Sequence, residues 1–337
     1  MKHAKTLFIL KKNETYGFHH YCRRSSGLWN SINFIVKDLK ERGVHCHIEE
    51  VQDNNCIDRV VSQFKPDIVV IEALWVVPEK FDVLKKLHPK VRWFVRLHSH
   101  MPFLALEGIA MEWIEGYFKR GLGVIANSEP MFDALYPISP KGKLLYLPNV
   151  YRAEKKQYGQ RKHFGSQLNI GCFGAVRPLK NQLIQALAAI QFAKELNAPL
   201  CFFINGSRVE TGGDPVLKNI KALFAGRENS HLILCDWAEH EDFIDLIRDM
   251  DISMQVSLTE TFSIVSADSV TAGVPLVTSK EVEWASPSCK ARDNDINDIV
   301  KKMKKVYKNN RLVCKNKMLL DKASDRASQL WFKFIRS

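Results

Sequence analysis

The chain has 337 residues, of which 46% are hydrophobic and 26% charged, and its formal net charge is +12. This length suits two domains better than one core, and the composition excludes a disordered or fibrous chain. The eight cysteines form no CxxC pair, which argues against a disulfide framework or a cysteine-held zinc ion. No apolar run is long enough for a secretion signal or a membrane span, so we expect a cytoplasmic protein.

Apolar strands and amphipathic helices alternate along the whole chain. The first half predicts helices over 28–42 and 78–88, and strands at 6–10, 45–51, 67–72, 91–97 and 123–127. The second half predicts strands at 168–174, 200–205, 231–236, 251–256 and 275–279. Strands separated by helices form parallel sheets with right-handed crossovers, so the sequence predicts two doubly wound, Rossmann-like α/β domains.

A polar, basic stretch without a clear period separates the two halves. We expect a first domain over 1–150, a linker over 151–166 and a second domain over 167–315. The remaining residues, 316–337, predict a C-terminal helix, with a return to the first domain as one option.

Positive charge gathers in the linker and at the C-terminal end. Residues 290–337 hold fourteen Lys and Arg against five Asp and Glu, a net +9, and residues 151–162 add a net +4. Such a run commonly forms a solvated helix face. The alternative is a polyanionic partner, either nucleic acid or an anionic membrane surface.

The loops that follow strands are the first candidates for a ligand site, because open parallel sheets bind ligands beyond the carboxyl ends of their strands. After the first strand, Gly27 begins a helix whose N–H groups suit an anion, and the lack of GxGxxG argues against a dinucleotide. After the strand at 168–174 come Gly174, Arg177 and Lys180. Two cations and free backbone amides in one turn suit a diphosphate.

The segment TETFSIVSADSVTAGVP, residues 259–275, places one acid on each side of a helix start. Glu260 lies on the loop after a strand, and Asp268 lies inside an apolar helix over 262–272 that ends near Gly273. A buried carboxylate is costly unless a polar group meets it. Either the two acids are solvated, or a ligand with paired hydroxyl groups, such as a sugar, lies across them.

These residues resemble a known enzyme family. ETFSIVSADSVTAGVPLV resembles the Glu-x7-Glu region of retaining glycosyltransferases of the GT-B fold, especially family 4, and FGAVRPLKN resembles their phosphate-binding turn. SGLWNSINFIVKDLKERGVHCHI, VRLHSHMP, GVIANSEPMFDAL and LLYLPNVY resemble further segments of the family, so the resemblance covers nearly the whole chain. It implies two Rossmann-like domains that face a central cleft.

The resemblance also implies residue roles. Arg177 and Lys180 would neutralise the leaving diphosphate, Glu260 would contact the transferred sugar, and Asp268 would hold the ribose. His98 would line the reaction centre, with His100 as its competitor. The implied catalytic residues are His98, Arg177, Lys180 and Glu260, and the implied donor-binding residues are Gly27, Gly174, Arg177, Lys180, Glu260, Thr261, Phe262, Ser263 and Asp268.

Two departures from the family pattern stand out. The second acid is Asp268, one methylene shorter than the usual Glu. The family arginine lies nearer the glycine, where this chain has Ala175, so Arg177 matches that role only approximately.

The implied reaction moves a sugar, with retention, from a nucleotide-diphosphate sugar (a UDP-sugar by preference) to an acceptor hydroxyl. No DxD-type acidic site stands out, so we expect no metal requirement. The favoured acceptor is a hydroxymethylated base in DNA, as in phage DNA modification inside a bacterial host. The alternatives are an envelope glycan or lipid acceptor, with peripheral membrane contact, and a non-catalytic nucleotide- or nucleic-acid-binding protein.

Overall fold

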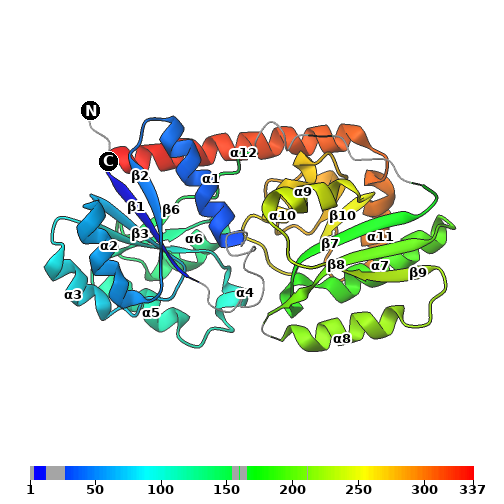
Figure 1. Cartoon of the computed structure of the whole chain (residues 1–337), viewed down its shortest axis with the longest axis horizontal. Coiled ribbons are helices and arrows are strands. Elements are labelled where there is room, and N and C mark those ends of the chain that lie inside the picture. The colour runs from blue at the N-terminus through cyan, green and yellow to red at the C-terminus, as the bar shows by residue number, and fades with distance from the viewer. Residues whose placement is uncertain (1–3, 13–26, 154–158, 160–164, 211) are drawn as a thin grey trace. The chain divides into compact units, whose positions relative to one another are not determined.

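The structure is a computed structural model of the chain, and it describes residues 4–12, 27–153, 159, 165–210 and 212–337 (Figure 1). The chain divides into two compact units. Unit 1 comprises Met1–Arg152 and Ala323–Ser337, and unit 2 comprises Ala153–Lys322. Part of the predicted linker, together with Ser25, Ser26 and the aromatic-basic run HHYCRR before them, lies outside the described residues.

Unit 1 contains a parallel six-stranded sheet with the order β2-β1-β3-β4-β5-β6. The strands are β1 (Thr6–Lys11), β2 (Cys46–Val51), β3 (Ile68–Glu72), β4 (Arg92–Leu97), β5 (Gly123–Ala126) and β6 (Leu144–Tyr146). Five of them match the predicted strands to within one residue at each end. The sixth, β6, was not predicted because three residues are too few to show a period.

Helices cover both faces of this sheet. They are α1 (Gly27–Glu41), α2 (Ile57–Phe64), α3 (Lys80–Leu87), α4 (Met101–Leu104), α5 (Ala110–Lys119), α6 (Glu129–Leu135) and the second half of α12 (Asn310–Arg336). Leu7 and Ile9 of β1 belong to a core that includes residues of α2, α3, α5 and α6, whereas Phe8 and Leu10 pack with α1 and with Trp331 of α12. Alternate side chains of one strand therefore face opposite layers, as a doubly wound sheet requires.

Unit 2 contains a parallel five-stranded sheet with the order β11-β10-β7-β8-β9. The strands are β7 (Leu168–Val176), β8 (Leu200–Val209), β9 (Ser230–Leu234), β10 (Ile252–Gln255) and β11 (Leu276–Thr278). The helices are α7 (Gln182–Glu195), α8 (Gly213–Phe224), α9 (His240–Arg248), α10 (Ile264–Thr271), α11 (Ile296–Val306) and the first half of α12.

The two faces of this sheet have separate cores. One core joins the strands to α7, α8 and α11, and the other joins Phe173 and Phe203 to residues of α9 and α10. The prediction of two doubly wound α/β domains is therefore confirmed. Among the described helices, none combines the length and apolarity needed to cross a membrane.

The strand order of unit 2 also shows where a ligand would bind. From β7 the chain proceeds outward through β8 and β9, and then returns to place β10 and β11 on the other side of β7. The order therefore reverses between β7 and β10. Open α/β sheets bind ligands beyond the carboxyl ends of the strands at such a point.

Candidate functional site

Near the end of β7 lies a glycine with an unusual backbone. Gly174 has φ +108°, a region that favours glycine, and its N–H donates to Oδ1 of Asn205 on β8 at 2.8 Å. A β-carbon at this position would lie 3.8 Å from Cε of Lys180. The φ angle, rather than a lack of space, therefore favours glycine at this position beside the predicted cation.

Asn181 ties the turn after β7 to the end of β10. It adopts the left-handed conformation with φ 58°, and its side-chain amide donates to the carbonyl of Val256 at 3.0 Å and to that of Asp293 at 2.7 Å. The N–H of Leu258 donates to the carbonyl of Leu179 at 2.9 Å. These bonds hold the loops after β7 and β10 side by side at the point where the strand order reverses.

Lys180 and Glu260 meet between these two loops. Nζ of Lys180 forms an ion pair with Oε1 of Glu260, and the two side chains are only 13% and 9% exposed. The hydroxyl of Ser257 donates to the same carboxylate oxygen at 3.0 Å. The structure thus brings together two predicted site residues that are eighty positions apart in the chain.

The predicted residues Thr261, Phe262 and Ser263 lead from Glu260 into α10. Ser263 caps the helix with φ 62°, a strained value for a residue with a side chain, and its hydroxyl accepts from the N–H of Ser266 at 3.3 Å. The carbonyl of Phe262 accepts from the indole of Trp284 at 2.8 Å. The helix begins four residues after Glu260, so the backbone N–H groups of its first turn lie near the same loop.

Asp268 lies in the middle of α10 and is 1% exposed. Its Oδ1 lies 2.8 Å from Nε2 of His240, the first residue of α9. A buried carboxylate therefore has an imidazole partner that was not predicted from the sequence. A single histidine at a helix start gives no pattern by which to find it.

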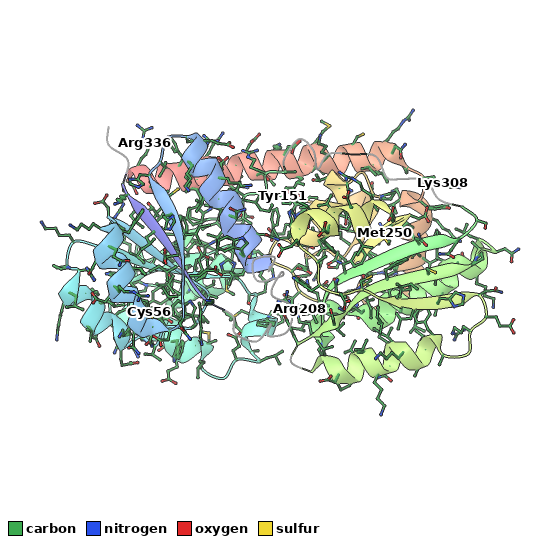
Figure 2. The ribbon with its side chains drawn as sticks, viewed as in Figure 1. Cys56, Tyr151, Arg208, Met250, Lys308 and Arg336 are labelled. Atoms are coloured by element: carbon green, nitrogen blue, oxygen red, sulfur yellow. The ribbon has the colours of Figure 1, made fainter. Side chains whose placement is uncertain are left out.

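Arg177 does not join the Lys180–Glu260 pair. Its guanidinium forms an ion pair with Glu210 at 2.9 Å, and Arg208 pairs with the other oxygen of Glu210 at 2.7 Å. Arg208, labelled in Figure 2, also lies 4.3 Å from the ring centre of Trp237. Arg177 and Lys180 follow the same strand, but each has its own acidic partner.

In unit 1, the predicted residue His98 contacts a buried ion pair. Nε2 of His98 lies 2.5 Å from Oε2 of Glu72, and Arg96 reaches the same oxygen at 3.3 Å. Glu72 and Arg96 are fully buried, and Arg96 also donates to Oδ1 of Asn149. Burial and the neighbouring Arg96 lower the pKa of His98, with Glu72 acting in the opposite direction. The lowered pKa favours the neutral form of His98.

The remaining predicted positions differ in their surroundings. His100 is more buried than His98, and its Nε2 lies 2.7 Å from the hydroxyl of Ser128. Gly27 is the exposed first residue of α1, with open space where a β-carbon would be. Among the described residues, no group of three or more His, Cys, Asp or Glu could hold a metal ion.

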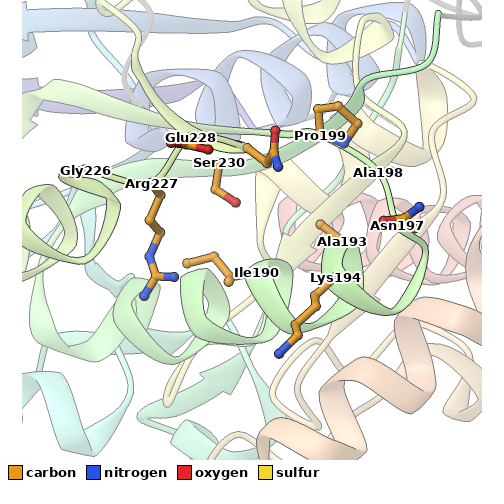
Figure 3. Close-up of a pocket in the computed structure, with 11 residues that line it drawn as sticks. Ile190, Ala193, Lys194, Asn197, Ala198, Pro199, Gly226, Arg227, Glu228 and Ser230 are labelled. Carbon is orange, nitrogen blue, oxygen red and sulfur yellow. The ribbon is translucent and has the colours of Figure 1, made fainter.

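A separate hollow of about 610 Å³ lies at the opposite, amino end of the unit 2 sheet (Figure 3). It is lined by the end of α7, the segment leading into β8 and the turn before β9, with Lys194 and Arg227 as its cations. None of the predicted site residues lines it. It is therefore distinct from the Lys180–Glu260 site.

No family model matches the chain, and no curated protein matches it in sequence. Solved structures do share its fold. The chain is similar to the catalytic domain of starch synthase IV from Arabidopsis thaliana bound to ADP and acarbose, with 10% identity, full coverage of both chains and a TM-score of 0.69. It is also similar to a sucrose-phosphate synthase from Thermosynechococcus elongatus, with 11% identity, coverage of 98% and 96%, and a TM-score of 0.68.

A third similar structure is TarM from S. aureus, solved as a variant with fondaparinux, alpha-GlcNAc-glycerol and UDP. The identity is 14% and the TM-score is 0.63, and the match covers 83% of this chain but only 58% of TarM. The chain thus spans little more than half of that protein. These likenesses show that the chain has the GT-B fold of two parallel-sheet α/β domains.

Proposed function

We propose that this protein is a retaining glycosyltransferase that moves a sugar from a nucleotide-diphosphate donor to an acceptor hydroxyl. The observation that carries the proposal is the Lys180–Glu260 pair, held between the loops after β7 and β10 where the strand order reverses. The structural neighbours support it, because the starch synthase domain is bound to ADP and the TarM variant to UDP. Unit 2 would bind the donor, a UDP-sugar by preference, and unit 1 would present the acceptor.

The chemistry follows from where charge develops. As the glycosidic bond to the diphosphate breaks, negative charge grows on the leaving oxygens, and fixed cations and backbone N–H groups stabilise that charge more than the ground state. Lys180 would exchange part of its contact with Glu260 for the diphosphate. Glu260 would then accept hydrogen bonds from the hydroxyl groups of the transferred sugar, and the start of α10 would face the phosphates.

Asp268 would hold the nucleoside of the donor. A carboxylate accepts hydrogen bonds from paired ribose hydroxyls, and His240 fixes where this carboxylate lies. Arg177 would contribute positive charge beside the diphosphate by leaving Glu210, whose second partner is Arg208. Retention would follow from attack and departure on the same face of the sugar.

For the acceptor we propose a hydroxymethylated base in duplex DNA. The support is electrostatic, because the chain carries a net charge of +12, of which residues 290–337 contribute +9. An enzyme that acts on a base within a duplex must also turn that base out of the stack.

One observation favours a second acceptor class, a lipid-linked or envelope glycan. Leu106, Ile109 and Met111, around the loop between α4 and α5 of unit 1, are 66%, 46% and 42% exposed. Exposed apolar side chains this close together are typical of contacts with lipids or apolar partners. Glu107 and Glu112 lie among them, however, and would repel an anionic membrane surface.

The test is sugar transfer by the purified protein, read by mass spectrometry. UDP-, GDP- and ADP-sugars would be combined with hydroxymethylated duplex DNA, plain duplex DNA and a lipid-linked glycan. A gain of one sugar mass on the hydroxymethylated duplex alone supports the DNA acceptor, whereas a gain on the lipid-linked glycan alone selects the second class. No turnover of any donor would leave a non-catalytic nucleotide-binding protein. Retention is tested by NMR of the product, because an inverted anomeric carbon would overturn it.

A further inference from the structure

Unit 2 ends in a segment rich in exposed cations. Helix α11, the turn after it and the first half of α12 carry seven exposed cations, and six of them form no ion pair among the described residues: Lys301, Lys305, Lys308, Arg311, Lys315 and Lys322. We call these six residues the basic surface; Lys308 is labelled in Figure 2. In the described part of the chain none of the six forms an ion pair, whereas Lys304 beside them pairs with Glu195.

Three of these cations follow one face of α12. Arg311, Lys315 and Lys322 share this face with Met318, because the four positions are spaced by four, three and four residues. They fall within an arc of about 60° and along about 16 Å of the helix. Asn316 and Leu320, on the opposite side, are buried. The exposed acid of this half-helix, Asp321, lies about 100° around the helix from Lys322. Exposed Asp325, three residues after Lys322 on nearly the same side, pairs with Arg152. In the described part of the chain no acid is therefore paired with these three cations.

Two kinds of polyanion could bind this face of α12: a nucleic acid or an anionic membrane surface. A helix that binds a membrane surface inserts an apolar face with Trp, Phe or Leu into the lipid. Here the apolar side of the helix is buried in the protein, and between positions 296 and 322 the large exposed hydrophobic residue is Met318, 72% exposed. The basic surface has charge but little to insert, which is the character of a surface that binds phosphates by electrostatic attraction.

We propose that the basic surface binds the phosphate backbone of duplex DNA and so delivers the acceptor to the enzyme. The inference rests on the proposed function for the identity of the acceptor, but it assigns the binding to named residues of unit 2. Duplex DNA carries one charge for about every 1.7 Å of its axis, so several phosphates lie within reach of a stripe of cations about 16 Å long. These contacts position the DNA without reading its sequence.

The surface predicts a measurable salt dependence. Each neutralised phosphate releases bound counterions, so the slope of log K against log salt changes by about 0.9 for each phosphate that a variant no longer neutralises. The variant Arg311→Gln/Lys315→Gln/Lys322→Gln removes three charges from one helix face without touching the Lys180–Glu260 site. We expect its slope to be shallower by about two to three, roughly 0.9 for each charge. We expect its affinity at about 0.1 M salt to fall at least about tenfold.

The matched control is Lys86→Gln/Lys90→Gln/Lys141→Gln, which removes the same charge from exposed positions of unit 1. Fluorescence anisotropy with a labelled duplex would compare both variants and wild type over a salt series. Sugar transfer would be measured on a hydroxymethylated duplex and on the free hydroxymethylated nucleoside. We expect that only the basic-surface variant loses DNA affinity, and that it loses transfer to the duplex but keeps transfer to the nucleoside.

The outcomes separate the two proposals. If wild type binds the duplex through these residues but transfers no sugar to any DNA, the acceptor is wrong and the basic surface stands. If wild type transfers sugar to the duplex while the basic-surface variant keeps wild-type affinity and slope, the inference is overturned. Binding of wild type to vesicles with phosphatidylglycerol, but not to duplex DNA, would also overturn it.

Discussion

His240 Nε2 lies 2.8 Å from Oδ1 of Asp268 and joins the first residue of α9 to the middle of α10. This contact explains how an acid can lie inside an apolar helix. The Asp268 carboxylate is 1% exposed. Burying a neutral polar group without hydrogen bonds costs on the order of 2–7 kcal/mol, and burying an unpaired carboxylate costs more. The imidazole offsets that cost and fixes the direction of the carboxylate.

The first prediction concerns donor binding at this pair. Asp268→Asn should raise KM for the donor, with a smaller effect on kcat, because the ribose is held equally in the ground and transition states. His240→Ala should have the same effect in a weaker form, and His240→Gln should retain more of the affinity by keeping a polar partner for Asp268. Steady-state kinetics measures KM and kcat, and titration calorimetry with UDP measures the affinity for the nucleotide. A loss confined to kcat would contradict the ribose-holding role.

The second prediction concerns Lys180. Lys180→Ala should lower kcat/KM by at least about tenfold, or about 1.4 kcal/mol, because the charge on the leaving diphosphate loses its fixed cation. Lys194→Ala is the matched control, since that lysine lies at the hollow on the other end of the unit 2 sheet. Steady-state kinetics would be paired with a thermal melt to confirm folding. A wild-type value for Lys180→Ala would remove this residue from the diphosphate site.

The third prediction follows from the lowered pKa of His98, whose main cause is burial and whose second is Arg96. In the unfolded chain His98 binds a proton near pH 6.5, whereas in the folded protein it binds the proton only at lower pH. The contribution of neutral His98 to the stability of the fold is therefore complete above about pH 6.5 and is lost as the pH falls below it. The variant His98→Gln should lose less stability than wild type between about pH 7.5 and 5.5. The difference is at most about 1.4 kcal/mol for each pH unit. The free energy of unfolding of both proteins would be measured by melting at each pH. The same change with pH for wild type and His98→Gln would show that His98 does not titrate in this way.

The fourth prediction concerns the part of α12 that packs in unit 1. Trp331 is fully buried, donates its indole N–H to the carbonyl of Pro148 at 2.8 Å and lies 5.2 Å from the guanidinium of Arg96. Trp331→Ala should destabilise the protein by about 3–5 kcal/mol, because it leaves a large cavity. Trp331→Phe keeps most of the ring and should cost less. Phe332→Ala, at a half-buried position, serves as the control. An equal loss of stability for Phe332→Ala and Trp331→Ala in denaturant melts would show that burial of Trp331 is not the cause.

The two-domain fold could be predicted from the sequence because each buried strand is a short apolar run between helices. The strands predicted at 67–72 and 251–256, for example, agree with β3 and β10 to within one residue at each end. The loop between β10 and α10 could also be predicted from the sequence. Glu260 follows the end of a strand, Asp268 lies in the next helix, and Gly273 follows the end of that helix. The end of β8 could not be predicted from the sequence. Val209 pairs with Val176 after a shift in the register of the two strands, and the alternation of apolar residues does not indicate such a shift.

Other parts of the sites depend on contacts between distant segments. Glu72 interrupts an apolar run, and the cost of burying it could have indicated the Arg96 and His98 that meet it in the fold. His240 and Glu210 gave no such signal, because each lies among other polar residues near a helix or strand end. Pairing between side chains that are 28 or 33 positions apart is set by packing, which a local pattern does not contain.

Glycosyl transfer at the Lys180–Glu260 site is tested most directly by release of nucleoside diphosphate from UDP-, GDP- and ADP-sugars. Wild type, Lys180→Ala and Lys194→Ala would be compared side by side. We expect wild type and Lys194→Ala to release the diphosphate from at least one donor, and Lys180→Ala to do so at least about tenfold more slowly. The same rate for all three proteins, or no release from any donor by a protein that binds the nucleotide, would contradict glycosyl transfer at this site.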